Sequence, residues 1–215
     1  MALSCIVFDC DGVILESVPV KTRAFARVAA PFGAKAVERL LMHHKAHGGV
    51  SRYTKFEWLY REVLGREITQ DELEELGRRY AEIAFEEVCR CELVPGVEAV
   101  LKRWQGRVPM YICSGAPHEE LNLVLKGRGL DQYFAGIYGF PPAKAELLRG
   151  IIKRAGVDPA TAVMVGDSVT DLDAAEAVGT LFYGRGGELQ GGGFPWGEDL
   201  TRLNEWLEAL YAAGS

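Results

Sequence analysis

The sequence lacks the features that mark nucleic-acid-binding proteins and membrane proteins. Its 215 residues include 24 Lys and Arg against 30 Asp and Glu, a net charge of −6 at pH 7, and they form no basic patch. No apolar run approaches the roughly 20 residues that cross a bilayer as a helix. The opening MALSCIVFD has no basic region and no long apolar stretch, so we expect no signal peptide. We therefore expect neither nucleic acid nor a membrane as a partner.

Cysteine pairs with the Cys-x-x-Cys spacing are also absent. Three of the five cysteines lie in or beside apolar, strand-like runs, which predicts reduced, mostly buried thiols in a cytoplasmic protein. The CRC triplet could form a redox pair, but reduced thiols are the favoured interpretation. The five residues are Cys5, Cys10, Cys89, Cys91 and Cys113.

Short apolar runs alternate with helical patterns along most of the chain. We predict five buried strands, at residues 2–8, 108–114, 134–140, 161–167 and 180–184. Helical periodicity separates them and closes the chain, at residues 118–126, 144–155, 172–178 and 198–212. This alternation predicts a doubly wound α/β fold with a parallel sheet.

The segment between the first two strands departs from this alternation, because residues 18–91 read as helical throughout. A crossover between parallel strands needs only one helix, so several helices predict an inserted helical domain. We place this domain at residues 17–91, with an α/β domain formed by residues 1–16 and 92–215. Its last helix begins with Thr69 and Glu72, which have the spacing of a capping box.

The first predicted strand ends in CIVFDCDGV, which places two acids two residues apart. Since side chains alternate along an extended segment, Asp9 and Asp11 should share one side of it. Open α/β sheets bind ligands at the carboxyl ends of their strands, and two close carboxylates suit a hard cation such as Mg²⁺. Gly12 permits a sharp turn or a close approach there. The alternative for this stretch alone is a solvated Asp-Gly turn.

Further polar side chains follow the other predicted strands. Asp167 ends one strand in MVGDSVTD, and Asp171 enters the helix behind it. Ser114, in YICSGAP, ends another strand before a helix that Pro117 begins, and a helix N-terminus offers free N–H groups to an anion. Lys144 also begins a helix, where the helix dipole disfavours a cation; a phosphate or a carboxylate beside it would explain this placement.

The order of the segments DCDGVILES, CSG, PPAK and GDSVTD resembles that of the haloacid dehalogenase-like hydrolases. The resemblance covers the whole chain, including a helical cap inserted after the first segment. It implies a Rossmann-like parallel sheet of strand order 5-4-1-2-3 and a reaction through a phospho-aspartyl intermediate. Similar members read Asp-Ser where this chain has Glu16 and Ser17, and we expect little catalytic effect because this position lies in the linker to the cap.

The resemblance also implies roles for individual residues. Asp9 would be the nucleophile that attacks phosphorus, and Asp11 would protonate the leaving alcohol and then accept a proton from water. Ser114 would donate a hydrogen bond to a phosphoryl oxygen, with the Gly115 N–H beside it. Lys144 would neutralise the charge on the nucleophile and on the phosphoryl group.

A Mg²⁺ cofactor follows from the same resemblance. Its protein ligands would be the carboxylates of Asp9 and Asp167 and the backbone carbonyl of Asp11. Asp171 would hold either Lys144 or a metal-bound water.

Within the helical insertion, HGGVSRYTKFEWL resembles the cap of beta-phosphoglucomutase and of related sugar-phosphate phosphatases. There a Gly-x-Ser-Arg element places an arginine over the active site. Arg52 is the matching residue, and Lys55 lies three residues on, on the same helical face. Both are predicted to bind substrate, Arg52 through an anionic group remote from the reacting phosphate. The alternative is an N-cap at Ser51 followed by two solvated basic residues.

Two other features carry less specific signals. His43 and His47 lie four residues apart, with His44 nearby, but no carboxylate or cysteine completes a zinc site at suitable spacing, which favours a packed or solvated helix. The glycine-rich stretch 184–197 lacks the Gly-Lys-Ser/Thr ending of a P-loop and is predicted to be a flexible connection.

Three functions remain open at this point. The favoured one is a Mg²⁺-dependent phosphatase, a phosphoric monoester hydrolase acting on a small phosphorylated metabolite such as a sugar or sugar-acid phosphate. The cap suggests a phosphomutase, but GDSVTD has a Gly-Asp pair where the mutases have Glu-Asp. A phospho-accepting signalling receiver shares the sheet but has neither a second acid like Asp11 nor a helical insertion, and dehalogenases also lack that acid.

Overall fold

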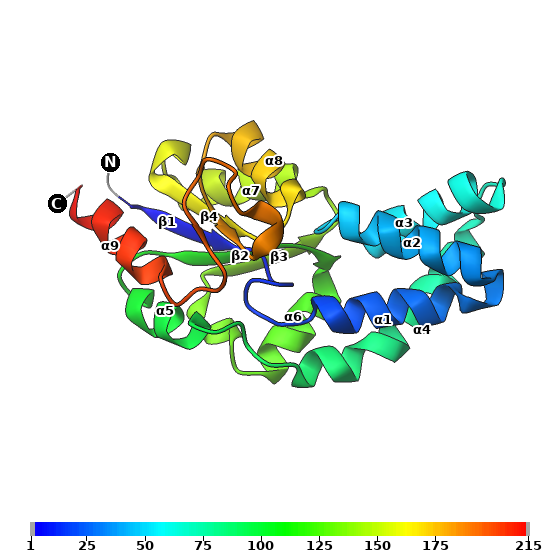
Figure 1. Ribbon diagram of the computed structural model, residues 1–215. Coiled ribbons are helices and arrows are strands. Elements are labelled where there is room, and N and C mark those ends of the chain that lie inside the picture. The colour runs from blue at the N-terminus through cyan, green and yellow to red at the C-terminus, as the bar shows by residue number, and fades with distance from the viewer. Residues whose placement is uncertain (1–2, 214–215) are drawn as a thin grey trace.

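The computed structural model describes residues 3–213, so the predicted strand start at Ala2 lies outside the described residues. A parallel sheet in the order β3-β2-β1-β4-β5-β6 forms its centre (Figure 1). The strands are β1 (Cys5–Phe8), β2 (Met110–Pro117), β3 (Gly136–Phe140), β4 (Ala162–Gly166), β5 (Leu181–Arg185) and β6 (Trp196–Gly197). The doubly wound α/β fold is confirmed: the five predicted strands lie in the order 5-4-1-2-3, and a short β6 joins the edge beside β5.

Helices cover both faces of the sheet because side chains alternate along each buried strand. The helices are α1 (Val18–Ala29), α2 (Ala34–Ala46), α3 (Arg52–Leu59), α4 (Gln70–Arg90), α5 (Val97–Trp104), α6 (His118–Gly127), α7 (Lys144–Ala155), α8 (Val169–Val178) and α9 (Leu203–Ala212), with short 3₁₀ or π turns at Ala30–Phe32, Tyr60–Leu64, Asp131–Tyr133, Pro159–Thr161 and Gly187–Leu189. On β1, Ile6 and Phe8 belong to the core shared with α5, α6 and α9, whereas Cys5 and Val7 belong to the core shared with α7 and α8.

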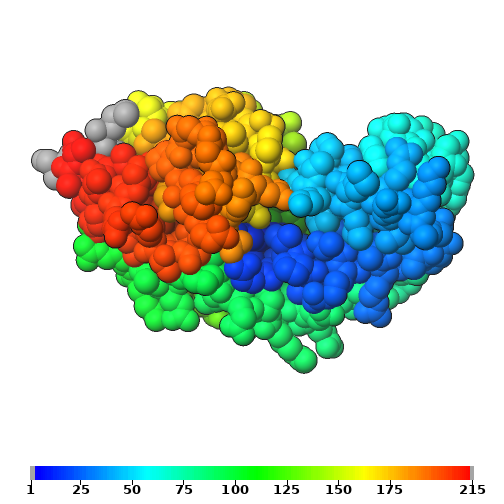
Figure 2. Space-filling model, in the orientation of Figure 1, coloured from blue at the N-terminus to red at the C-terminus, as the bar shows by residue number. Residues whose placement is uncertain are grey.

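Helices α1 to α4 lie together beyond the carboxyl ends of the strands (Figure 1), and Figure 2 shows α1 to α3, blue to cyan, as a lobe beside the sheet. Aromatic side chains fill the centre of this helical group: the Phe25 ring lies 5.6 Å from the Phe56 ring and 4.6 Å from the Tyr80 ring. The predicted capping box is confirmed, since Glu72 N donates to Thr69 Oγ1 at 3.3 Å and Thr69 N donates to Glu72 Oε2 at 3.0 Å.

Two helices differ from the prediction. Helix α5 is not among the predicted helices, although Val97, Val100, Leu101 and Trp104 have the i, i+3, i+4, i+7 spacing of a buried face. Helix α8 begins earlier than predicted, directly after β4, because the Asp171 carboxylate accepts hydrogen bonds from Ser168 in its first turn. Within residues 3–213, no helix has the length and apolar character needed to span a membrane.

Candidate active site

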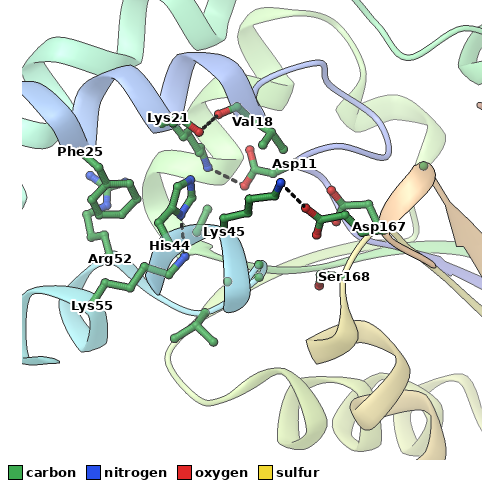
Figure 3. Close-up of a pocket in the computed structure, with 18 of the residues that line it drawn as sticks. Asp11, Val18, Lys21, Phe25, His44, Lys45, Arg52, Lys55, Asp167 and Ser168 are labelled. Carbon is green, nitrogen blue, oxygen red and sulfur yellow. Dashed lines mark hydrogen bonds and ion pairs between the residues drawn. The ribbon is translucent and has the colours of Figure 1, made fainter. Parts of the chain in front are cut away.

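Polar side chains from different segments meet at the carboxyl edge of the sheet, facing the helical group. Asp9 follows β1, Ser114 lies in β2 and Asp167 follows β4. Lys144 and Asp171 come from the first turns of α7 and α8. A cavity of about 650 Å³ lies between this edge and the helices (Figure 3). Parallel strands end on one edge, so residues far apart in sequence converge there.

The deepest part of the site is a buried ion-pair network around Lys144. Its Nζ lies 3.1 Å from Asp9 Oδ2 and donates a hydrogen bond to Asp171 Oδ1 at 2.6 Å. The other Asp171 oxygen accepts hydrogen bonds from Ser168 N at 3.2 Å and Ser168 Oγ at 2.6 Å. Burial disfavours the ammonium, but the charges of Asp171 and Asp9 outweigh this effect and raise the pKa of Lys144. The network therefore holds a permanent positive charge against the Asp9 carboxylate.

The acids of this network are arranged in a way that suits a divalent cation. One carboxylate oxygen from each of Asp9, Asp167 and Asp171 lies within 4.8 Å of the other two. Burial raises the pKa of Asp9 to about 7, although Lys144 lowers it, and burial with the Asp9 charge raises the pKa of Asp167 well above its usual value. Such clustered carboxylates need more positive charge than Lys144 supplies, and hard oxygen donors are the ligands that Mg²⁺ prefers.

These acids differ in how many of their carboxylate oxygens are free to bind a metal. Both oxygens of Asp171 already accept hydrogen bonds, whereas Asp167 accepts none from the described residues and its Oδ2 would lie 2.0 Å from a Cβ at Gly12. Gly12 has φ +75°, so its lack of a side chain matters twice, for the turn and for the approach of Asp167. The carboxylates of Asp9 and Asp167 are therefore the ones best able to hold a metal.

The Asp11 carboxylate does not join this cluster. The chain turns sharply here, because Ile14 N and Leu15 N both donate to Cys10 O at 2.9 Å. Strand β1 ends before this turn, and the shared side predicted for Asp9 and Asp11 stays a prediction. Asp11 Oδ1 instead accepts a hydrogen bond from Ser17 Oγ at 2.5 Å, and Oδ2 pairs with Lys21 Nζ at 2.5 Å. Burial would raise the pKa of Asp11, but the charge and hydrogen bond of Lys21 and the hydrogen bond of Ser17 lower it overall.

Sequence reasoning did not identify Lys21 or Ser17 as site residues. Their signal is modest: Ser17 precedes the first turn of α1, and Lys21 lies four residues later on the same face. The Lys21 side chain is 14% exposed and lines the cavity together with Asp11 (Figure 3). These two residues fix the position and charge of the predicted acid–base group.

We expect Lys21→Met to lower kcat for an aryl phosphate about 10-fold and to move the acidic limb of its pH profile about one pH unit higher. An aryl leaving group needs little protonation, so kcat reports the second step, in which the Asp11 carboxylate accepts a proton from water. Without the ammonium, the pKa of Asp11 rises, so this carboxylate forms only at higher pH. The measurement is kcat for an aryl phosphate between about pH 4 and pH 8. Lys45→Met is the matched control, because Lys45 lines the same cavity with its side chain 80% exposed. An unchanged pH profile in Lys21→Met would contradict this role.

Ser114 and Gly115 lie under a loop of the helical group. Ser114 is buried, and its Oγ accepts a hydrogen bond from Ala116 N at 3.2 Å. A Cβ at Gly115 would lie 1.9 Å from Gly49 O, and one at Gly49 would lie 2.8 Å from Lys144 Nζ. Thr170 Oγ1 also donates a hydrogen bond to the backbone carbonyl of Gly48 at 2.5 Å. The loop between α2 and α3 therefore covers the carboxyl edge of the sheet directly.

Arg52 and Lys55 both face the cavity, so the alternative of two solvated basic residues is wrong. Ser51 is nevertheless the N-cap of α3, since Tyr53 N donates to its Oγ at 3.3 Å. Arg52 donates to Glu120 Oε1 and Oε2 at 2.7 and 2.6 Å and stacks over the ring of Tyr80 at 4.4 Å. Lys55 Nζ lies 2.9 Å from His44 Nδ1. The sequence pattern contains no signal for Glu120 or His44 as their partners.

His43 and His47, the other two histidines of the predicted cluster, belong to a stack of rings. The His43 ring stacks on Trp58 at 3.9 Å and on His47 at 4.0 Å, with no metal-ligand group around them in the part of the chain that the structure describes.

The glycine-rich stretch 184–197 is partly ordered by contacts with the first loop of the sheet. It contains the end of β5, a 3₁₀ turn and β6. Arg185 donates to the Gly12 carbonyl at 3.0 Å and pairs with Glu16, the position where the family resemblance expects Asp. This stretch therefore supports the loop that follows Asp9.

Comparison with known proteins gives the family. The model of the family described as haloacid dehalogenase-like hydrolase matches residues 3–179 of this chain. The chain is 30% identical to phosphoglycolate phosphatase 1 of Pseudomonas aeruginosa, covering 83% of this chain and 69% of the relative, and 27% identical to a phosphoglycolate phosphatase of Rhodospirillum rubrum, covering 94% and 90%. The crystal structure of beta-phosphoglucomutase from Clostridium difficile has the same fold, with a TM-score of 0.81 at 17% identity over 100% of this chain and 99% of that one. The chain belongs to the haloacid dehalogenase-like hydrolases.

Proposed function

We propose that this chain is a Mg²⁺-dependent phosphatase that hydrolyses a small phosphorylated acid or sugar through a phospho-aspartyl intermediate on Asp9. The observation that carries the proposal is the buried Asp9 carboxylate, which lies 3.1 Å from Lys144 Nζ and beside Asp167, a residue that lines the cavity. The names of the curated relatives, phosphoglycolate phosphatases, support a small monoester with a nearby carboxylate.

The proposed reaction has two steps. An Asp9 oxygen attacks phosphorus, the P–O bond to the alcohol breaks, and Asp11 gives the departing oxygen a proton. Water then attacks the aspartyl-phosphate, Asp11 takes the water's proton, and inorganic phosphate leaves. Lys144 keeps a positive charge beside the reacting oxygens throughout. Asp9 and Asp167 would hold Mg²⁺, which would supply further positive charge for the phosphoryl oxygens.

We also propose that residues 17–91 act as a cap over the α/β domain formed by residues 1–16 and 92–215. Two contacts between these parts support this: the ion pair between Arg52 and Glu120, and the packing of Gly49 on Gly115. A cap of this kind excludes water from the site and commits a bound substrate to reaction.

The first test is phosphate release from a panel of phosphate monoesters with and without Mg²⁺. We expect chelation to abolish turnover and added Mg²⁺ to restore it. A phosphomutase would convert a sugar monophosphate into its isomer without net release of phosphate, so product analysis separates the two activities. Phosphate release that persists after exhaustive chelation would contradict the metal dependence.

We expect Asp167→Ala to raise the Mg²⁺ concentration for half-maximal activity at least about 10-fold, because one of two available anionic ligands is lost. A direct Mg²⁺ titration by calorimetry provides a readout that is independent of turnover. Asp173→Ala is the control, since Asp173 is exposed on α8 near the same edge. Equal Mg²⁺ requirements in both variants would argue against a ligand role for Asp167.

A further inference from the structure

The cavity is lined by more positive side chains than the reaction itself requires. Five lysine and arginine residues line it, and four of them are paired with carboxylates. These pairs are Lys21 with Asp11, Lys45 with Glu188, Arg52 with Glu120, and Arg185 with Glu16. Lys55 is the exception: none of the carboxylates in residues 3–213 lies within 4.0 Å of its Nζ.

The surroundings of Lys55 make this missing partner costly. The residue is 2% exposed, and its Nζ lies 2.9 Å from His44 Nδ1 and 5.5 Å from the Phe25 ring centre. A His44 tautomer with the proton on Nε2 accepts one hydrogen bond, which leaves two ammonium hydrogens without a charged acceptor. Burial, followed by the charge of Lys21, lowers the pKa of Lys55 to about 7. An anion placed beside Nζ would remove this cost.

Arg52, in contrast, already has a carboxylate partner within the protein. Both oxygens of Glu120 accept from its NH2 group, and its NH1 group donates to Gly77 O at 3.4 Å. Its side chain is only 4% exposed, between a cap helix and α6 of the α/β domain. The ion pair of Arg52 therefore joins the two parts of the molecule, and this geometry disfavours the expected role of Arg52 as the grip on a remote anionic group.

The position of Lys55 in the cavity indicates which end of a substrate would carry the bound anion. Figure 3 shows Asp11 and Asp167 on one side of the cavity and Lys55 with His44 on the other. A phosphate monoester with its phosphoryl group at the acidic side would point its other end toward Lys55. One ammonium beside one neutral imidazole matches the single negative charge of a carboxylate. A second phosphate dianion would need further hydrogen-bond donors, such as a bidentate arginine, and the bidentate pair of Arg52 is formed with Glu120.

We propose that Lys55, held by His44, binds a carboxylate of the substrate and so determines specificity for small phosphorylated acids. This inference rests on the proposed phosphatase function and assigns the recognition of the non-reacting end to a cap residue pair. The carboxylate accepts hydrogen bonds from Lys55 Nζ, and His44 Nδ1 keeps the ammonium turned toward the cavity.

The test compares 2-phosphoglycolate with ethyl phosphate, which differs by having a methyl group in place of the carboxylate. For Lys55→Met, we expect kcat/KM for 2-phosphoglycolate to fall about 10- to 100-fold, the loss expected for a charged hydrogen bond, and kcat/KM for ethyl phosphate to change less than about 3-fold. Lys55→Arg should retain part of the preference, and Lys45→Met should retain all of it. Arg52→Met should lower kcat/KM for both substrates alike, because the partner of Arg52 is Glu120 of the protein and not the substrate.

Three results would overturn the proposal. These are equal losses on both substrates in Lys55→Met, unchanged kinetics in that variant, or a carboxylate-selective loss in Arg52→Met instead. A larger Lys55→Met loss on 1,2-ethanediol bisphosphate than on 2-phosphoglycolate would reassign the subsite to a second phosphate, which also contradicts the proposal.

Binding to a turnover-deficient protein separates this proposal from the proposed function. Calorimetry with Mg²⁺ and 2-phosphoglycolate on Asp9→Asn should show about 10- to 100-fold weaker binding when Lys55→Met is added. If this loss is seen although the wild-type protein releases no phosphate from any ester, the carboxylate subsite stands and the phosphatase function fails. If the wild-type protein releases phosphate but binding does not depend on Lys55, the phosphatase function stands and the subsite fails.

Discussion

An Asp9→Asn protein is expected to fold normally and to lose at least about 10⁴-fold in kcat, the order of loss seen when an enzyme's attacking group is removed. The amide is nearly isosteric, and its oxygen can still accept the hydrogen bond that Cys10 N donates to Asp9 Oδ1 at 2.8 Å. It cannot attack phosphorus, because a neutral amide is a poor nucleophile. The substitution also removes one of three crowded carboxylates, so its thermal midpoint should stay close to the wild-type value.

The measurement is single-turnover and steady-state phosphate release by protein whose fold is checked by circular dichroism. Asp173→Asn is the matched control, because it makes the same chemical change at an exposed position of α8. Wild-type protein quenched in acid during turnover should carry a phosphoryl group on the peptide that contains Asp9, and Asp9→Asn should carry none. Substantial turnover by a pure, folded Asp9→Asn protein would end the nucleophile assignment.

The convergence of Asp9, Lys144, Asp167 and Asp171 could be predicted from the sequence. Parallel strands end at one edge of a sheet, so a polar residue directly after a buried run is placed there by topology alone. Strand order and the helical insertion followed from the alternation of apolar runs and from the resemblance of the segments. The short β6 did not, because two residues in a glycine-rich stretch carry no periodicity.

The partners of the individual side chains could not be predicted in the same way. Arg52 and Glu120 are 68 residues apart in the sequence, and their ion pair depends on how α3 lies against α6. The contacts of Asp11 with Lys21 and Ser17 depend on the turn at Cys10, which leads the chain toward α1. In both cases the decisive geometry comes from docking or from a loop, for which periodicity gives no register.

Lys144→Met is expected to lower kcat about 10³-fold and to destabilise the fold by about 3–5 kcal/mol, the cost of removing one partner from a buried ion pair. The Lys144 side chain is 2% exposed, and its loss leaves Asp9 and Asp171 buried without their cation. Burial already raises the pKa of Asp9 to about 7 against the lowering effect of Lys144. Without that effect the pKa rises further, so the attacking carboxylate forms only at higher pH and the remaining activity should increase toward alkaline pH.

A second substitution separates the structural role of Lys144 from its catalytic role. Adding Asp171→Asn to Lys144→Met removes a buried charge that has lost its partner, so it should restore much of the lost stability while leaving kcat low. Urea denaturation gives the free energies of unfolding, and phosphate release at saturating substrate and Mg²⁺ gives kcat for the two single variants and the double variant. If kcat recovers together with stability, Lys144 acts only by holding the fold, since Met cannot supply positive charge to the phosphoryl group. If kcat stays about 10³-fold low in a stable double variant, the positive charge 3.1 Å from Asp9 acts on the reaction itself.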